Sequence, residues 1–108
     1  MPKKVIDYSK TLMYKIVCND PNVKDVYVGS TTSFVDRKRV HKSYCNNALS
    51  KSYNFKVYQI IRNNGGWNNF TMILIEYYPC NGKNEATARE RYWYEKLNAN
   101  MNTNECTK

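Results

Sequence analysis

Long hydrophobic runs are missing from this chain of 108 residues. No apolar stretch approaches the roughly 20 residues that cross a bilayer, and residues 1–10 have no apolar signal core. We therefore expect a soluble, intracellular protein, cytoplasmic or nuclear, with no membrane contact. The length fits a single domain over residues 1–108, and 14% aromatic residues together with short apolar runs argue against disorder.

Cysteine and histidine are too few and too scattered for a zinc site or a disulfide framework. Cys18, Cys45, Cys80 and Cys106 form no C-x-x-C pair, and His41 is the single histidine. Zinc ligands usually lie about two to four residues apart in pairs. Nothing in the sequence indicates export to an oxidising compartment. We therefore expect reduced, mostly structural thiols.

Phosphate-binding glycine loops are also absent, since neither G-x-x-x-x-G-K-[ST] nor G-x-G-x-x-G occurs. A serine or cysteine hydrolase is disfavoured because His41 has no evident acidic orienter. Acidic residues are scarce, 9 against 17 Lys and Arg, which gives a formal net charge of +8 at pH 7. This excess favours a polyanion such as nucleic acid, although a membrane surface or an acidic partner would also fit it.

The beginning of the chain predicts a β-hairpin. Residues 12–18 and 26–28 are β-prone runs separated by a segment rich in turn-forming residues. Because side chains alternate along a strand, Tyr14 and Tyr27 share one face of the hairpin if the register allows it. Ordinary strand residues are the alternative to a functional pair of phenols.

A basic helix is predicted after the hairpin. Ser33 is a suitable N-cap for a helix that begins at Phe34. On this helix Arg37 and His41 lie four residues apart and therefore share one face. A solvated basic surface is the alternative to a functional site. Three further cations surround this face: Lys38, Arg39 and Lys42.

The remainder of the chain predicts a second helix, a strand and a last helix. The second helix spans about residues 53–63 and ends at the glycine pair 65–66. Residues 71–75 read as a strand that is covered on both faces. The last helix spans about residues 85–97, with Asn84 as its N-cap. The core-facing residues of the second helix are expected to be Val57, Ile60 and Ile61.

A carboxylate interrupts the apolar stripe of the last helix. At about 100° per residue, Ala86, Glu90, Trp93 and Leu97 form one stripe. A buried carboxylate is costly unless something pairs with it. An arginine ion pair or a stripe that is only partly buried would explain Glu90 structurally. A metal ion would explain it functionally, because hard divalent cations prefer oxygen ligands.

These residue types fit the hydrolysis of a phosphodiester. The reaction needs a base for water, a cation for the non-bridging oxygens and help for the leaving group. Phenols, a guanidinium, an imidazole and a carboxylate on a basic protein supply those functions. In chain order the candidate motifs are Met13-Tyr14, Tyr27-Val28-Gly29-Ser30, Arg37, His41 and Glu90-Arg91-Tyr92-Trp93.

With this spacing the chain resembles the GIY-YIG nuclease domain over about residues 11–104. The resemblance implies an α/β (α+β) domain, with a small three-stranded antiparallel sheet flanked by about three helices. It also implies an endonuclease that uses a divalent metal, Mg²⁺ or Mn²⁺. Leu12 stands where the family has its first glycine, which leaves open a catalytically inactive nucleic-acid-binding module as the alternative.

The resemblance also implies roles for individual residues. Glu90 would bind the metal, Arg37 would stabilise the phosphate, and Tyr14 or Tyr27 would position or deprotonate water. His41 matches a further active-site position, and Asn102 or Asn104 matches a late asparagine that closes the site in some members. The expected partner is nucleic acid, with DNA preferred, and a homodimer or a specificity partner would supply target choice. Candidate contacts to the nucleic-acid backbone are Lys15, Lys38, Arg39 and Lys42.

Overall fold

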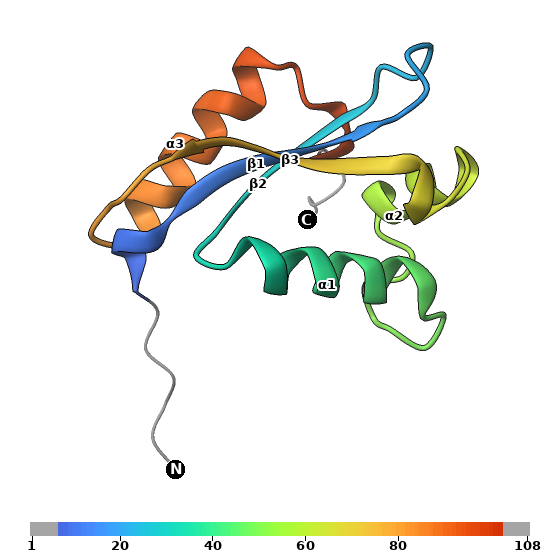
Figure 1. The fold of residues 1–108 in the computed structure, drawn as a ribbon, viewed down its shortest axis with the longest axis horizontal. Coiled ribbons are helices and arrows are strands. Elements are labelled where there is room, and N and C mark those ends of the chain that lie inside the picture. Colours follow the sequence, from blue (N-terminus) through green and yellow to red (C-terminus); the bar gives the residue numbers. More distant parts are fainter. Residues whose placement is uncertain (1–6, 103–108) are drawn as a thin grey trace.

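Three antiparallel strands form one sheet, with helices on both of its sides (Figure 1). The computed structural model describes residues 7–102. This arrangement confirms the predicted α+β fold with a three-stranded antiparallel sheet. The elements, in chain order, are β1 (Leu12–Cys18), β2 (Val26–Thr31), α1 (Phe34–Asn46), α2 (Lys56–Asn63), β3 (Phe70–Tyr77) and α3 (Lys83–Lys96). Short 3-10 helices occur at Tyr8–Lys10, Trp67–Asn69 and Asn100–Asn102.

The hairpin and the first helix form as the sequence predicts. β1 has the predicted bounds, and β2 continues to Thr31. The register pairs Tyr14 with Gly29, which places Tyr14 and Tyr27 on the same face of the sheet. The Ser33 hydroxyl accepts a hydrogen bond from the backbone N–H of Asp36 and caps α1.

Two helices begin elsewhere than predicted. α2 starts at Lys56, because residues 50–55 form successive turns closed by backbone hydrogen bonds. α3 starts at Lys83 with Gly82 as its N-cap residue, so the assignment of Asn84 as the cap was wrong. Gly82 has extended backbone geometry, and its carbonyl accepts the first helical hydrogen bond, from the Ala86 N–H.

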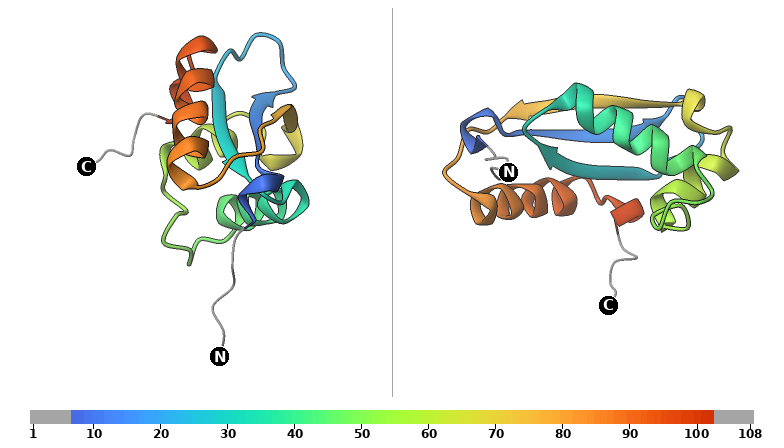
Figure 2. Two further views of the ribbon diagram at one scale, coloured as in Figure 1. Left: turned by 90° about the vertical axis from the view of Figure 1, so that its left-hand side faces the viewer. Right: turned by 90° about the horizontal axis from the view of Figure 1, so that it is seen from below.

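The expectation that the third strand is covered on both faces was also wrong. β3 is an edge strand in the order β2-β1-β3, and Ile73 and Leu74 are each 38% exposed. α3 packs against β2, at the opposite edge of the sheet, and therefore leaves part of β3 open (Figure 2). The apolar run from 70 to 77 thus reflects one buried face plus an exposed edge.

The main core lies between the sheet and the two helices α1 and α2 (Figures 1 and 2). Its strand residues include Tyr14 and Ile16 of β1 and Met72 of β3, while α2 contributes Tyr58 and Ile61.

Within residues 7–102, every helix is too short or too polar to span a bilayer. Three cysteines within residues 7–102 are free thiols: Cys18 and Cys45 are buried and Cys80 is partly buried, whereas Cys106 lies outside the described residues.

Candidate active site

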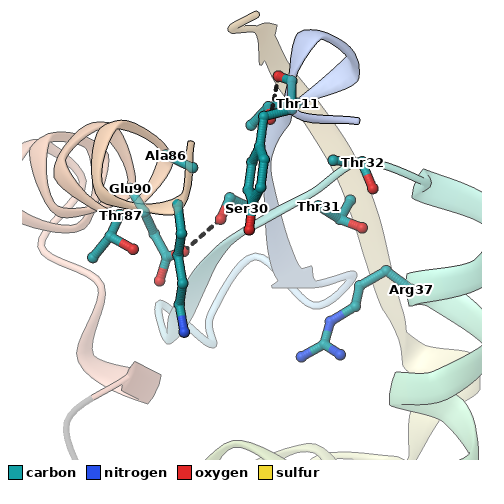
Figure 3. A pocket seen from close by; sticks show the side chains of 10 residues that line it. Thr11, Ser30, Thr31, Thr32, Arg37, Ala86, Thr87 and Glu90 are labelled. Atoms are coloured by element: carbon teal, nitrogen blue, oxygen red, sulfur yellow. Dashed lines mark hydrogen bonds between the residues drawn. The ribbon is translucent and has the colours of Figure 1, made fainter. Parts of the chain in front are cut away.

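A pocket of about 490 Å³ opens between α1 and α3 at the end of β2 (Figure 3). β2 supplies Ser30 and Thr31 to its floor, and Arg37 and Glu90 stand on its opposite sides. The hairpin and the helices therefore bring together two charged side chains that are distant in sequence. The remaining residues of the lining are Tyr8, Thr11, Thr32, Lys83, Ala86 and Thr87.

Glu90 lies half-buried on α3 with its carboxylate directed toward β2 (Figure 3). The Ser30 hydroxyl donates a hydrogen bond of 2.8 Å to Glu90 Oε1. Burial raises the pKa of Glu90, while hydrogen bonds from Ser30 and the charge of Arg37 oppose that rise. Within residues 7–102 the ion pairs do not include Glu90. In the described part of the chain this carboxylate is therefore partly buried, and Ser30 is the residue that hydrogen-bonds to it.

The stripe predicted on α3 is divided between two environments. Ala86 is the buried residue of this helix. Trp93 donates its indole N–H to a different carboxylate, that of Glu76 on β3, at 2.8 Å. Arg89 also binds Glu76 through two N–H groups. This bonding, above all that from Arg89, lowers the pKa of Glu76. The paired structural carboxylate is thus Glu76, which the sequence analysis did not single out.

Arg37 interacts electrostatically with Tyr14, which is not among the residues that line the pocket. Tyr14 is 1% exposed, and burial raises its pKa well above the usual value, reinforced by Tyr27 and opposed by Arg37. Burial tends to lower the pKa of Arg37, but its electrostatic interaction with Tyr14 leaves that pKa raised. Glu90 also acts electrostatically on Tyr14. The guanidinium, the phenol and the carboxylate therefore share one electrostatic environment.

The two phenols and the imidazole pack against one another beneath Gly29. The ring centroids of Tyr14 and Tyr27 are 6.3 Å apart, and those of Tyr27 and His41 are 5.4 Å apart. A Cβ atom on Gly29 would lie 2.5 Å from the Tyr14 hydroxyl oxygen. Glycine is therefore needed at this position because any side chain would collide with Tyr14.

His41 is completely buried between two tyrosines. Its Nε2 lies 2.6 Å from the Tyr14 hydroxyl, and its Nδ1 lies 2.7 Å from the Tyr58 hydroxyl. The sequence analysis missed Tyr58, which α2 buries beside Val57 and Ile61. Helical periodicity could have placed Tyr58 near the core, but its contact with His41 depends on how α1 and α2 pack. The predicted inward residue Ile60 is only partly buried.

The buried imidazole makes folding sensitive to pH. Burial and the charge of Arg37 lower the pKa of His41 from 6.5 to about 3. Between these two values the unfolded chain binds a proton that the folded chain does not, so the free energy of unfolding falls as the pH decreases. We expect it to be about 1 kcal/mol lower at about pH 5.5 than at about pH 7, in urea unfolding experiments. The His41→Gln variant should lose this component, and an unchanged pH dependence in that variant would contradict the assignment.

The predicted basic contacts occupy different surfaces. Lys38 and Lys42 are exposed and lie four residues apart on α1, next to the Arg37 and His41 stripe. Arg39 is exposed and pairs with Asp36 at 2.8 Å. Lys15 points to the sheet face opposite to that of Tyr14. Asn102 ends the last 3-10 helix, but its side chain and the whole of Asn104 lie outside the described residues.

The sheet, the flanking helices and the arginine–glutamate pocket are the features expected of a small nuclease domain. The chain matches the GIY-YIG catalytic domain over residues 10–104, and it belongs to this family. Its fold is similar to that in the structure of the catalytic domain of the homing endonuclease I-TevI. The TM-score is 0.70 at 24% sequence identity, covering 92% of this chain and 100% of that one. No curated protein matches the chain significantly. Family membership confirms the resemblance and supports a nuclease acting on nucleic acid.

The donor set around Glu90 fits a loosely held divalent cation. In the described part of the chain no group of three or more His, Cys, Asp or Glu side chains could enclose a metal ion. Mg²⁺ is commonly bound by one or two carboxylates and completes its shell with water and substrate phosphate oxygens. A cation at Glu90 would also offset the burial that raises the pKa of this carboxyl group. Glu90 is therefore suited to Mg²⁺ or Mn²⁺ when substrate is present.

Proposed function

We propose that the protein is a metal-dependent endonuclease that hydrolyses phosphodiester bonds in DNA. The observation that carries this proposal is the placement of Arg37 and Glu90 on opposite sides of one pocket. The formal net charge of +8 adds attraction for a polyanion. Membership of the GIY-YIG family supports the same class of reaction.

Arg37 is the proposed phosphate-binding residue. A guanidinium donates charge-assisted hydrogen bonds to phosphate oxygens, and such bonds strengthen as negative charge develops in the transition state. Tyr14 interacts electrostatically with this guanidinium. Lys83 lines the same pocket from the start of α3 and supplies a second cation for the flanking phosphate.

Tyr27 is the proposed residue for orienting and deprotonating water. Tyr14 is 1% exposed and its hydroxyl already contacts His41, whereas Tyr27 is half-exposed. A phenol has a pKa near 10 and is a weak base at neutral pH. Arg37 interacts electrostatically with Tyr27. The partly exposed ring of Tyr27 is therefore more accessible to water than the buried ring of Tyr14.

Glu90 is the proposed metal-binding residue, and Ser30 orients its carboxylate through Oε1. A divalent ion bound there would supply positive charge to the phosphate and to the departing 3′ oxygen. The residues of the chain position the phosphodiester relative to that charge: Arg37 from α1, and Lys83 from the same helix as Glu90.

The remaining cations are proposed to contact the nucleic-acid backbone. Three of these cations are exposed on α1, the helix that carries Arg37: Lys38, Arg39 and Lys42. Lys15 would contact a segment of nucleic acid that passes the opposite face of the sheet. Phosphate contacts give binding that is salt-sensitive but independent of sequence. We therefore propose that target choice depends on a second copy of the chain or on a specificity partner.

Nicking of supercoiled plasmid, measured with Mg²⁺, with Mn²⁺ and with EDTA, tests the proposed function. We expect relaxed and linear products with either ion and none with EDTA. DNA binding should weaken as the salt concentration rises. Binding without cleavage, with Mg²⁺ or with Mn²⁺, would instead favour a catalytically inactive nucleic-acid-binding module. The specific argument for that alternative is Leu12, which stands where the first motif of the family has a glycine. Absence of both DNA binding and cleavage would contradict the endonuclease function and the binding-module function alike.

A further inference from the structure

Two side chains that line the pocket, Tyr8 and Lys83, have no partner in the part of the chain that the structure describes. The Tyr8 side chain makes no hydrogen bond and stacks on no other described ring, and the Lys83 ammonium belongs to none of the described ion pairs. Glu90 is also outside those ion pairs, so Lys83 is not its counter-ion. A few polar and aromatic groups that converge on a concave site are suited to hold a ligand.

Hydrogen bonds hold Tyr8 beside the start of α3. The Cys80 N–H donates to the Tyr8 carbonyl at 3.0 Å, and the Tyr78 N–H donates to the Thr11 carbonyl at 2.8 Å. The Thr11 hydroxyl also donates to the Tyr8 carbonyl, at 2.7 Å. The first 3-10 helix and the first turn of α3 therefore lie at the same end of the molecule (Figures 1 and 2). These bonds use the backbone of Tyr8, which leaves its ring free to face the pocket.

α3 carries this end of the pocket toward the proposed metal site. Lys83 and Glu90 both line the pocket from one face of the helix, seven residues apart. At about 1.5 Å per residue, their backbone positions are separated by about 10 Å along the helix axis. The pocket volume of about 490 Å³ lies within the range of about 300–1,000 Å³ that is typical of small-molecule sites. The pocket therefore has room for a nucleotide beside the scissile phosphate.

The residues at this end match the parts of a nucleotide. The ring of Tyr8 is partly exposed, and aromatic rings of this kind stack on bases with little regard to sequence. The ammonium of Lys83 is a point charge suited to a phosphate. A base that is paired and stacked inside a duplex cannot enter a pocket between two helices, because it must first leave the stack.

We propose that Tyr8 and Lys83 form a binding subsite for an unpaired nucleotide next to the scissile phosphodiester. The base stacks on the Tyr8 ring, and Lys83 binds the adjoining phosphate. The protein therefore prefers single-stranded or locally opened DNA to closed duplex. The position of the scissile bond rests on the proposed nuclease function, whereas binding of an unpaired strand does not depend on cleavage.

The stacking contact is tested by fluorescence anisotropy with a labelled thymidine oligonucleotide in EDTA, where no metal-dependent cleavage occurs. We expect the full chain to bind this strand several-fold more tightly than a duplex or an abasic chain of the same length. Tyr8→Ala should weaken binding about 5-fold or more and remove the preference over the abasic chain. Tyr8→Phe retains the ring and should bind as wild type does. Tyr77→Ala is the matched control, since it removes a ring that is 70% exposed on β3 outside the pocket, and it should not change binding.

The phosphate contact is tested by the salt dependence of the same binding. For single strands, the slope of log K against log salt is about −0.7 for each phosphate that a cation neutralises. Lys83→Ala should therefore reduce the steepness of this slope by about 0.7. Lys96→Ala removes an exposed cation from the other end of α3 and should leave the slope unchanged.

Three results would overturn the subsite: Tyr8→Ala that binds as tightly as Tyr77→Ala, equal wild-type affinity for the thymidine and abasic chains, or an unchanged salt slope in Lys83→Ala. The expected changes in binding, without cleavage in Mg²⁺ or Mn²⁺, would overturn the nuclease function and support the subsite. Metal-dependent cleavage with none of these changes in binding would support the nuclease function and overturn the subsite.

Discussion

Replacement of Arg37 by alanine is expected to lower the rate of DNA cleavage by about 10²- to 10³-fold. Arg37 is half-buried, lines the pocket from α1 and interacts electrostatically with Tyr14, so its donors are available to a phosphate in the pocket. Removing one preorganised donor of this kind typically costs that much in rate. Single-turnover cleavage of a labelled duplex with Mg²⁺ measures the effect without a contribution from product release.

The comparison with two other variants separates orientation from simple charge. Arg37→Lys retains the charge but loses the paired donors, and we expect it to recover only a small part of the rate. Arg91→Ala removes a cation from an exposed position on α3, where it pairs with Glu95, and should cleave within about twofold of wild type. An Arg37→Ala protein that cleaves as fast as Arg91→Ala would remove Arg37 from the mechanism.

Glu90→Gln is expected to abolish most of the metal-dependent cleavage, with a rate loss of about 10²-fold or more. Glutamine has nearly the same shape and can still accept the hydrogen bond from Ser30. It lacks the negative charge that a divalent cation requires. The same change should leave the free energy of unfolding unchanged or raised, because burial disfavours the charged carboxylate in the folded protein.

This combination of a stable fold and a lost activity distinguishes a metal-binding role from a structural one. Glu95→Gln is the matched control, since Glu95 lies on the same helix, is exposed and pairs only with Arg91 in the described ion pairs. We expect Glu95→Gln to cleave normally. A Glu90→Gln protein that retains cleavage, or that unfolds much more easily than wild type, would favour a structural carboxylate.

Local patterns were sufficient to predict much of the fold and part of the site. The alternation of β1 and β2 predicted that Tyr14 and Tyr27 share a face, and the four-residue spacing predicted the same for Arg37 and His41. The Ser33 cap fixed the start of α1 correctly. Each of these features depends on residues within one element or one hairpin, so the sequence contains the information directly.

The features that could not be predicted depend on contacts between elements. Tyr58 meets His41 because α2 packs beside α1, and Ser30 meets Glu90 because α3 lies along β2. The stripe on α3 reads as one surface, yet its residues divide between the pocket and the cluster around Glu76. A helical period reports which side chains share a face and not which partner covers each part of that face.

The rate of the double variant Arg37→Ala/Glu90→Gln tests most directly whether the two residues act on the same phosphodiester. Residues that work as one catalytic unit have strongly non-additive effects, so the double variant should cleave no more than about threefold slower than the slower single variant. Rate losses that multiply, to about 10⁴-fold or more below wild type, would mean that the guanidinium and the carboxylate act independently. That result would contradict a single active site between α1 and α3.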